Sequence, residues 1–333
     1  RASLEAAGIA VWTFAEVTAD PPEGMVLRAL AAARAEAIDG VVAVGGGSSL
    51  DTAKLVAVLA RSGQRLADIC GVGLVRGGRL PLVLAPPTAG TGSEGTPLAI
   101  VTTGEDEKKG VVSPQLLPDW AVLDPDLTLG LPAVVTAATG VDAMVHAIEA
   151  YTSRRLKNPL SDCLAREALR LLGGAIGRAC DTPGDRAARA DMLLGSALAG
   201  MAFANAPVAA VHALAYPLGG RFHVPHGLSN ALVLPHVLAF NLPEAGPLYA
   251  EIAPILFPEL AGSGAAARAE GLASGLAALA RALGMPTRLA EVGVARDDLP
   301  ALAADAMKQT RLLINNPREM TADAALRIYA AAL

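Results

Sequence analysis

The stretch VVAVGGGSSLDTAK, which runs from Val41 to Lys54, decides the fold of the first part of the chain. A short β-branched run precedes three glycines, and the residues from Ser48 onward have helical spacing. Glycines let a backbone approach a phosphate closely, and the N–H groups of a helix N-terminus favour negative charge. The GxGxxG fingerprint is absent, because Leu50 stands at its third glycine. The stretch predicts a strand, a diphosphate-binding loop and a helix, with a tight turn that binds nothing as the alternative.

The segments around this stretch alternate between strand-like and helix-like patterns. Strands are expected at GIAVWTF (8–14), GVVAV (40–44), LPLVLAPP (80–87), TPLAIVTT (96–103) and WAVLDP (120–125), and helices at MVLRALAAARAEA (25–37) and SSLDTAKLVAVLARSG (48–63). Apolar strands separated by helices are typical of a parallel sheet that is covered on both faces.

After Pro132 the pattern changes to long Ala/Leu-rich runs with helical spacing, and strand-like runs largely disappear. Helices are expected at 133–153, 161–179 and 267–284. A chain of 333 residues is long for one core, since domains commonly hold about 100–200 residues. We therefore expect an α/β N-terminal dinucleotide-binding domain at 1–131 and an all-α C-terminal domain at 132–333, divided near Leu131.

A second glycine-rich loop, PPTAGTGSEGTPLAI, follows another expected strand. It carries Thr88, Thr91, Ser93 and Thr96 among three glycines, and these residues supply hydroxyl and backbone donors. Open α/β sheets bind ligands at the carboxyl edge of their strands. Two such loops at the same edge favour a dinucleotide ligand over two bare turns.

Four side chains have the types and spacing of a metal site. Asp142 and His146 are four residues apart on one expected helix, so they point from the same face. His212 and His226 flank an expected turn at YPLGG (216–220) and offer two more imidazoles. Three histidines and one aspartate suit Fe(II) or Zn(II), whereas Mg(II) and Ca(II) prefer oxygen ligands. For each histidine alone, a place in the core is the alternative interpretation.

Composition excludes other classes of partner and suggests a compartment. The formal charge of −5 and the lack of a basic tract argue against a nucleic-acid surface. The three cysteines, Cys70, Cys163 and Cys180, are too widely spaced for a CxxC site and odd in number, which fits a reducing cytoplasm.

The uncharged segment from Met192 to Gly220 is long enough to span a bilayer, for which about 20 residues suffice. It nevertheless contains Asn205, His212 and two prolines, and it lacks an aromatic belt. We expect two buried helices here and no membrane partner.

Five motifs, GGGSSLDTAK, TAGTGSE, GVDAMVHAIEAY, VHALAYPLGG and PHGLSNALVLPHV, occur in an order and spacing that resemble the iron-dependent (group III) alcohol dehydrogenases. The resemblance extends from about Gly40 to LLINNPRE (312–319). It implies a dehydroquinate synthase-like two-domain architecture with the active site in the cleft between the domains. It also implies Fe(II), or alternatively Zn(II), together with NAD or NADP, a small alcohol or aldehyde substrate, and a homodimer or larger homo-oligomer.

The resemblance carries over to individual residues of this sequence. The family's metal ligands correspond to Asp142, His146, His212 and His226; its phosphate-binding stretch corresponds to Gly46, Gly47, Ser48 and Asp51; and Thr88, Thr96 and Leu98 fall where its second loop meets the cofactor.

Two departures from the family pattern affect these expectations. Many members have a histidine four residues after the third metal ligand, and this chain has Tyr216 there. A phenol with a pKa near 10 relays protons less readily at neutral pH than an imidazole near 6.5, so His223 is a second candidate for the relay. The chain also starts after the family's first strand, whose final acidic residue reads the ribose, so NAD and NADP both stay open.

The expected activity is hydride transfer between an alcohol and NAD(P), with the metal as Lewis acid. A maleylacetate-reductase-like enzyme that works without metal and a dehydroquinate-synthase-like lyase are alternatives with a related fold. A metallohydrolase or structural metal protein, whose glycine loops are only turns, is an alternative from another class.

Overall fold

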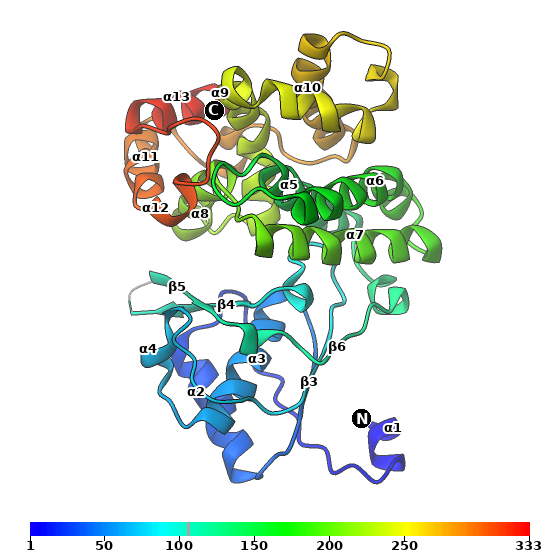
Figure 1. Cartoon of the computed structure of the whole chain (residues 1–333), viewed down its shortest axis with the longest axis vertical. Coiled ribbons are helices and arrows are strands. Elements are labelled where there is room, and N and C mark those ends of the chain that lie inside the picture. Colours follow the sequence, from blue (N-terminus) through cyan, green and yellow to red (C-terminus); the bar gives the residue numbers. More distant parts are fainter. Residues whose placement is uncertain (105–106) are drawn as a thin grey trace. The chain divides into compact units, whose positions relative to one another are not determined.

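The structure is a computed structural model that describes residues 1–104 and 107–333 (Figure 1). Its internal contacts divide the chain into two compact units. Unit 1 comprises Arg1–Ala85 and Thr96–Val122, and unit 2 comprises Pro86–Gly95 and Leu123–Leu333. Every strand in the described ranges lies in unit 1, whereas unit 2 is helical, so the expected α/β and all-α parts of the fold are confirmed. The division at Leu131 stays a prediction.

The stretch from Val41 to Lys54 folds as a strand, a loop and a helix, as predicted. The first sheet has the parallel order β1-β3-β6, formed by β1 (Val41–Val44), β3 (Leu82–Ala85) and β6 (Trp120–Ala121). Val44 pairs with Ala85, so β1 and β3 end at the same edge, where the glycine loop begins. Helix α3 (Gly47–Ser62) returns across the sheet and packs Leu50 in one core with Leu84.

The prediction of a single parallel sheet is wrong for the strand at 96–103. This strand, β4 (Leu98–Thr103), pairs antiparallel with β5 (Glu107–Val112), and β5 pairs with β2 (Gly71–Val72) in a separate sheet. Only residues 104–106 separate β4 from β5, and a parallel crossover needs a dozen or more residues.

The expected strand at 8–14 is also wrong. This segment follows the short helix α1 (Ala2–Ala6) without joining a ladder, and Ile9 and Trp12 are exposed. Its apolar pattern predicts burial, but burial requires a neighbouring strand, and no described strand pairs with this segment.

One face of the β1-β3-β6 sheet is open, so the expectation of cover on both faces is wrong too. Val42, Val44 and Trp120 are 57%, 61% and 72% exposed. The opposite face is covered by α3 through Ala53 and Ala57. An apolar strand sequence therefore does not distinguish a doubly covered strand from a singly covered one.

Unit 1 is completed by α2 (Glu23–Ala35), which confirms the expected helix at 25–37, and by α4 (Leu66–Ile69). Val26 of α2 and Leu55 and Leu59 of α3 share a core with the antiparallel sheet. Helix α3 thus contributes to the cores beneath both sheets and holds unit 1 together.

Unit 2 is a bundle of helices around one large hydrophobic core. Its helices are α5 (Ala133–Thr152), α6 (Pro159–Asp181), α7 (Arg186–Asn205), α8 (Ala210–Phe222), α9 (His226–Leu256), α10 (Ala265–Ala282), α11 (Leu299–Met307), α12 (Thr310–Leu313) and α13 (Ala322–Ala332). The expected helices at 133–153, 161–179 and 267–284 are confirmed as α5, α6 and α10.

Helix α5 lies inside this bundle, where α6, α7 and α9 pack against it (Figure 1). It is long and apolar enough to cross a membrane, but 72% of its most apolar 18-residue segment is buried within the protein. The segment from Met192 to Gly220 forms parts of α7 and α8, which meet at 109°. This outcome confirms the prediction of two buried helices.

The expected turn at YPLGG (216–220) is wrong, because α8 continues through it to Phe222. Pro217 lies inside the helix, where it lacks the N–H that would bond the fourth preceding carbonyl. The chain reverses instead at His223, whose left-handed conformation (φ 54°) ends α8. His223 donates its N–H to the carbonyl of Gly219, which closes the helix.

Candidate metal centre

Helix α5 supplies two of the four predicted metal ligands from the interior of unit 2. Asp142 and His146 are buried on the same helical face, as their spacing predicts. Glu149 lies almost one further turn along this face and is also buried. Three polar side chains in the middle of a core helix need partners, because an uncompensated buried charge is costly.

The other two predicted ligands come from the first turns of α8 and α9. His212 is buried in α8, and His226 is the first residue of α9 with a side chain 40% exposed. Gly227 brings the start of α9 against α5, since a Cβ there would lie 2.3 Å from the carbonyl oxygen of Ala138. A glycine is therefore required beside His226 for this close approach of two helices.

The structure brings Asp142, His146, His212 and His226 together, and one ligand atom of each lies within 4.8 Å of the others. The Asp142 Oδ1 atom is 3.9 Å from His212 Nε2 and 3.6 Å from His226 Nε2. Tetrahedral bonds of about 2.1 Å place neighbouring ligand atoms about 3.4 Å apart. These separations are close to those of a first-row metal site.

The electrostatics of the cluster suit a divalent cation. Burial lowers the pKa of His146 to about 3, so this imidazole is neutral at physiological pH. Burial by itself raises the pKa of Asp142, but the three histidines and the Asn230 amide outweigh it and keep this carboxyl below its usual pKa. An ionised carboxylate and a neutral imidazole are the protonation states that ligate metals.

Two buried atoms of the cluster, His146 Nδ1 and Asn230 Oδ1, make no hydrogen bond. The Asn230 amide nitrogen donates to Asp142 Oδ1 over 2.6 Å and lies 3.4 Å and 3.3 Å from Nε2 of His212 and His226. Buried polar atoms without partners are uncommon in native proteins. The residues therefore fit Fe(II) or a similar ion, since imidazole and carboxylate are its usual ligands.

The two candidates for proton relay differ in position. Tyr216 lies one turn after His212 on α8, and its ring centroid is 5.9 Å from that of His226. His223 is exposed in the turn between α8 and α9 and is not part of the four-residue cluster. The structure thus brings Tyr216 to the cluster, and the catalytic roles of both residues stay predictions.

The sequence interpretation missed three residues of this site. Glu149 bonds to His212, Asn230 bonds to Asp142, and Phe203 stacks on the His146 ring with centroids 4.6 Å apart. The signals were present for two of them: Glu149 follows Asp142 by seven residues, and Asn230 follows His226 by four. A single Phe in an apolar helix gives no such signal.

The glycine loop of unit 1 has the geometry of an anion-binding helix N-terminus. Gly46 is the N-cap of α3, and no side chain caps the first turn. Gly45 approaches Ser49 so closely that a Cβ would lie 2.5 Å from the Ser49 side chain. Gly47 and Ser48 begin the helix, so their positions suit a phosphate-binding role, which stays a prediction.

A buried lysine of α3, Lys54, joins Thr96 and Leu98 to the helix that also carries Asp51. Lys54 Nζ donates to Thr96 Oγ1 over 3.1 Å and to the Leu98 carbonyl over 2.7 Å. Asp51 lies 3.5 Å from Lys54 Nζ and accepts the Ile100 N–H. This network ties the glycine-loop helix to β4.

Thr88 belongs to the part of the second loop that lies in unit 2. The loop packs on α7, where Gly92 (φ 57°) lies so close to Gly200 that a Cβ would be 2.6 Å from its Cα. The loop therefore has a structural reason for its glycines in addition to the predicted cofactor contact.

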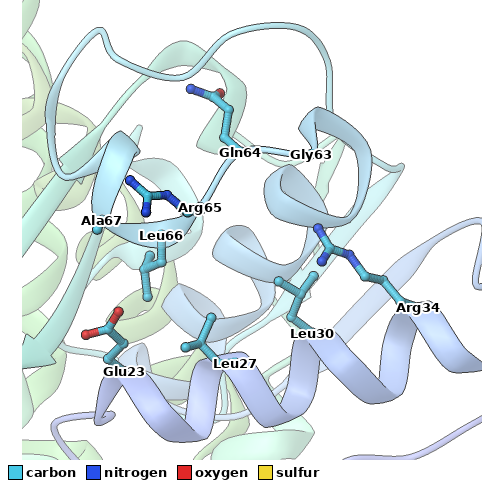
Figure 2. A pocket seen from close by; sticks show the side chains of 9 residues that line it. All are labelled: Glu23, Leu27, Leu30, Arg34, Gly63, Gln64, Arg65, Leu66 and Ala67. Atoms are coloured by element: carbon cyan, nitrogen blue, oxygen red, sulfur yellow. The ribbon is translucent and has the colours of Figure 1, made fainter.

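A cavity of about 370 Å³ lies in unit 1 beside α2 and α4 (Figure 2). Leu27, Leu30 and Leu66 form its apolar lining, and the guanidinium groups of Arg34 and Arg65 already bond to protein groups. No histidine or cysteine is among the residues that line it, so the cavity is not a second metal site.

The helical unit carries a cluster of three histidines and one aspartate, and the α/β unit carries a helix N-terminus at a glycine loop. Together these features are typical of an oxidoreductase that depends on a metal and a dinucleotide. Residues 1–125 match the model of the iron-containing alcohol dehydrogenases, and residues 136–333 match the C-terminal model of the Fe-containing alcohol dehydrogenase family. The chain belongs to the iron-containing alcohol dehydrogenase family.

Individual relatives agree with this assignment. Long-chain-alcohol dehydrogenase 1 of Geobacillus thermodenitrificans is 40% identical over 99% of this chain and 84% of its own length. The crystal structure of a 1,3-propanediol oxidoreductase has a TM-score of 0.95 at 36% identity and covers 99% of this chain and 86% of its own. Sulfoacetaldehyde reductase from Bifidobacterium kashiwanohense, solved with NAD⁺, has a TM-score of 0.88 at 28% identity and covers 99% and 88%.

The protein is therefore an enzyme that transfers hydride between an alcohol, or its aldehyde or ketone, and a nicotinamide cofactor, with Fe(II) and NAD(H) as the cofactors of its family. This conclusion fits better than the metal-independent reductase, the lyase and the metallohydrolase, because both halves of the chain match iron-containing alcohol dehydrogenases.

Proposed function

We propose that Asp142, His146, His212 and His226 hold Fe(II), with Zn(II) as the alternative, and that the enzyme interconverts a small alcohol and its aldehyde. The observation that carries this proposal is the cluster itself, in which three ligands are buried and four ligand atoms lie within 4.8 Å of one another. When bound, the cation supplies Lewis acidity toward the substrate oxygen, and the nicotinamide exchanges the hydride.

The residues of the cluster prepare the site for this chemistry. Asp142 contributes one negative charge to a divalent cation, and His146 contributes no charge, so the site keeps a net positive charge that favours an alkoxide over an alcohol. Phe203 and the surrounding core exclude water from one side of His146. Exclusion of water strengthens the electrostatic interactions within the site.

Tyr216 is the residue that we propose for proton transfer, because it lies beside His226 and one turn from His212. Its hydroxyl can donate and accept a proton, which a relay to solvent requires. His223 is the second candidate, supported by its exposed position three residues before His226.

For the cofactor, we propose that Gly46, Gly47 and Ser48 bind the diphosphate at the N-terminus of α3. Asp51, Thr88, Thr96 and Leu98 complete the proposed cofactor site. The uncapped first turn of α3 supports the phosphate position. NAD is favoured by the NAD⁺ complex of the sulfoacetaldehyde reductase that this chain resembles, and NADP is the alternative.

The cellular setting is part of the same proposal. We infer a cytoplasmic enzyme that forms a homodimer or larger homo-oligomer, with its α/β domain ending near Leu131. Cys70, Cys163 and Cys180 are free thiols in the structure, which supports a reducing compartment.

The test is NADH formation from a panel of short alcohols, diols and hydroxy acids with metal-stripped protein that is reloaded anaerobically with Fe(II) or Zn(II). His212→Ala should abolish metal-dependent turnover while cofactor binding is retained. His236→Gln is the matched control, because this histidine lies on α9 outside the cluster and should tolerate the change. Full activity of His212→Ala, or of the metal-stripped protein, would contradict the proposed site.

A further inference from the structure

Glu149 is a buried carboxylate whose two oxygens both accept hydrogen bonds from the start of α8. Its Oε2 lies 2.6 Å from His212 Nδ1 and accepts from the Ala209 N–H over 2.9 Å, and its Oε1 accepts from the Val211 N–H over 2.7 Å. The side chain is 5% exposed. A buried carboxyl group with three polar contacts to one segment indicates a specific task at that segment.

The contact with His212 determines which imidazole nitrogen carries the proton. Each Glu149 oxygen already accepts a backbone N–H, so the carboxylate acts as an acceptor toward the ring; we infer that His212 donates from Nδ1 and that Nε2 is left with its lone pair. His212 Nε2 is the nitrogen that lies 3.9 Å from Asp142 Oδ1, within the metal cluster. Glu149 therefore favours the tautomer that can bind a metal.

The contacts with the backbone fix the position of the ring as well. Ala209 is the N-cap residue of α8, and Val211 directly precedes His212. Ala209 has no side-chain cap of its own, so the Glu149 carboxylate caps this helix end. Asp142, His146 and Glu149 share α5, so this one helix holds two ligands and the group that holds a third.

We propose that Glu149 is a positioning residue of the metal centre, which orients His212, fixes its metal-binding tautomer and docks the start of α8 on α5. This inference rests on the proposed function, because it requires that His212 binds the metal. Carboxylates that accept from the second nitrogen of a metal-bound histidine raise its basicity, and their loss typically weakens metal affinity about 10–100-fold.

Glu149→Gln tests the proposal, because glutamine keeps the size and one acceptor oxygen but presents an amide N–H₂ to part of the donor set. Where that amide faces His212 Nδ1, the imidazole must accept there, and its proton moves to Nε2. We expect Zn(II) and Co(II) affinity, measured by competition with a chelator, to fall about 10–100-fold, and the visible spectrum of the Co(II) protein to change. The far-UV circular dichroism of the metal-free variant should match that of the unmodified protein.

Glu251→Gln is the matched control. Glu251 accepts from the Tyr151 hydroxyl over 2.5 Å within the same unit and is not part of the four-residue cluster. This variant should lose one carboxylate bond and keep its metal affinity. An equal loss in both variants would assign Glu149 a general structural role and overturn the proposal.

Further measurements separate the failure of this inference from that of the proposed function. If the unmodified protein binds no metal, or His212→Ala binds as tightly, the metal site itself is wrong. If His212→Ala loses affinity but Glu149→Gln does not, only the role of Glu149 is wrong. If the variant fails to fold, nitrogen NMR of the Zn(II)-loaded unmodified protein still tests the proposal. A proton on His212 Nδ1 supports it, and a proton on Nε2 overturns it.

Discussion

At Gly227, the addition of a single methyl group should weaken metal binding while the protein still folds. A Cβ at this residue would lie 2.3 Å from the carbonyl oxygen of Ala138 and 2.8 Å from its carbonyl carbon. Both contacts are with the backbone of α5, so no side-chain rotation relieves them. Since real contacts of a Cβ essentially never fall below 3.0 Å, Gly227→Ala must push α9 from α5 by roughly 0.7 Å or more.

This displacement acts directly on the metal site. His226 and Asn230 lie on the first turns of α9, and Asp142 lies on α5. Metal sites tolerate deviations of about 0.2 Å in ligand distance, so a shift several times larger should weaken Zn(II) binding by at least about tenfold. Overpacking should also reduce the free energy of unfolding by about 1–3 kcal/mol.

The assay is denaturant unfolding with and without Zn(II), together with chelator competition, compared between Gly227→Ala and Gly246→Ala. Gly246 lies in the same helix, but a Cβ there would meet only Leu242 Cδ1 at 4.0 Å. Because Gly246 precedes Pro247, whose ring crowds the Cβ of the residue before it, alanine here should change the free energy of unfolding by less than about 1 kcal/mol and leave metal affinity unchanged. If Gly227→Ala behaves like Gly246→Ala, the close approach of α9 to α5 does not position the site.

Three further variants test other features of the structure. His223→Gly should raise the free energy of unfolding by about 1 kcal/mol in denaturant titrations, because glycine adopts the left-handed φ of 54° without strain; a loss of turnover at unchanged metal affinity would instead support the relay role. Lys54→Met should remove the ammonium group that donates to the Leu98 carbonyl and to Thr96, destabilise unit 1 by about 1–3 kcal/mol and weaken NAD binding in calorimetry while Zn(II) affinity is kept. Asp119 has a pKa lowered to about 2, first by its hydrogen bond to Arg79 and next by the Leu82 N–H, so its stabilising effect is present above about pH 4 and is lost as the pH falls toward 2. Asp119→Ala should therefore lower the melting temperature at neutral pH and flatten its decline over that acidic window, and an unchanged decline would contradict this assignment.

The parts of the fold that the sequence predicts well are those with a local signal. Three glycines after a β-branched run predict the β1–α3 turn, and helical periodicity predicts α5, α6 and α10. The segment at 8–14 has an equally apolar pattern but forms no strand, because strand formation depends on a neighbour elsewhere in the chain. The same reason explains β4, whose direction is set by the short connection to β5 and not by its own residues.

The metal centre shows the same division between local and non-local information. The spacing of Asp142 and His146 fixes their common helical face, whereas their approach to His212 and His226 depends on how α8 and α9 pack on α5. Two features of the sequence control that packing. Gly227 removes the side chain that would separate α9 from α5, and Glu149 bonds the backbone at the start of α8. Two local features of the sequence thus indicate a contact between distant segments. One is a carboxylate in the middle of an apolar helix, and the other is a glycine directly after a histidine. Both lie on helices that also carry a proposed ligand.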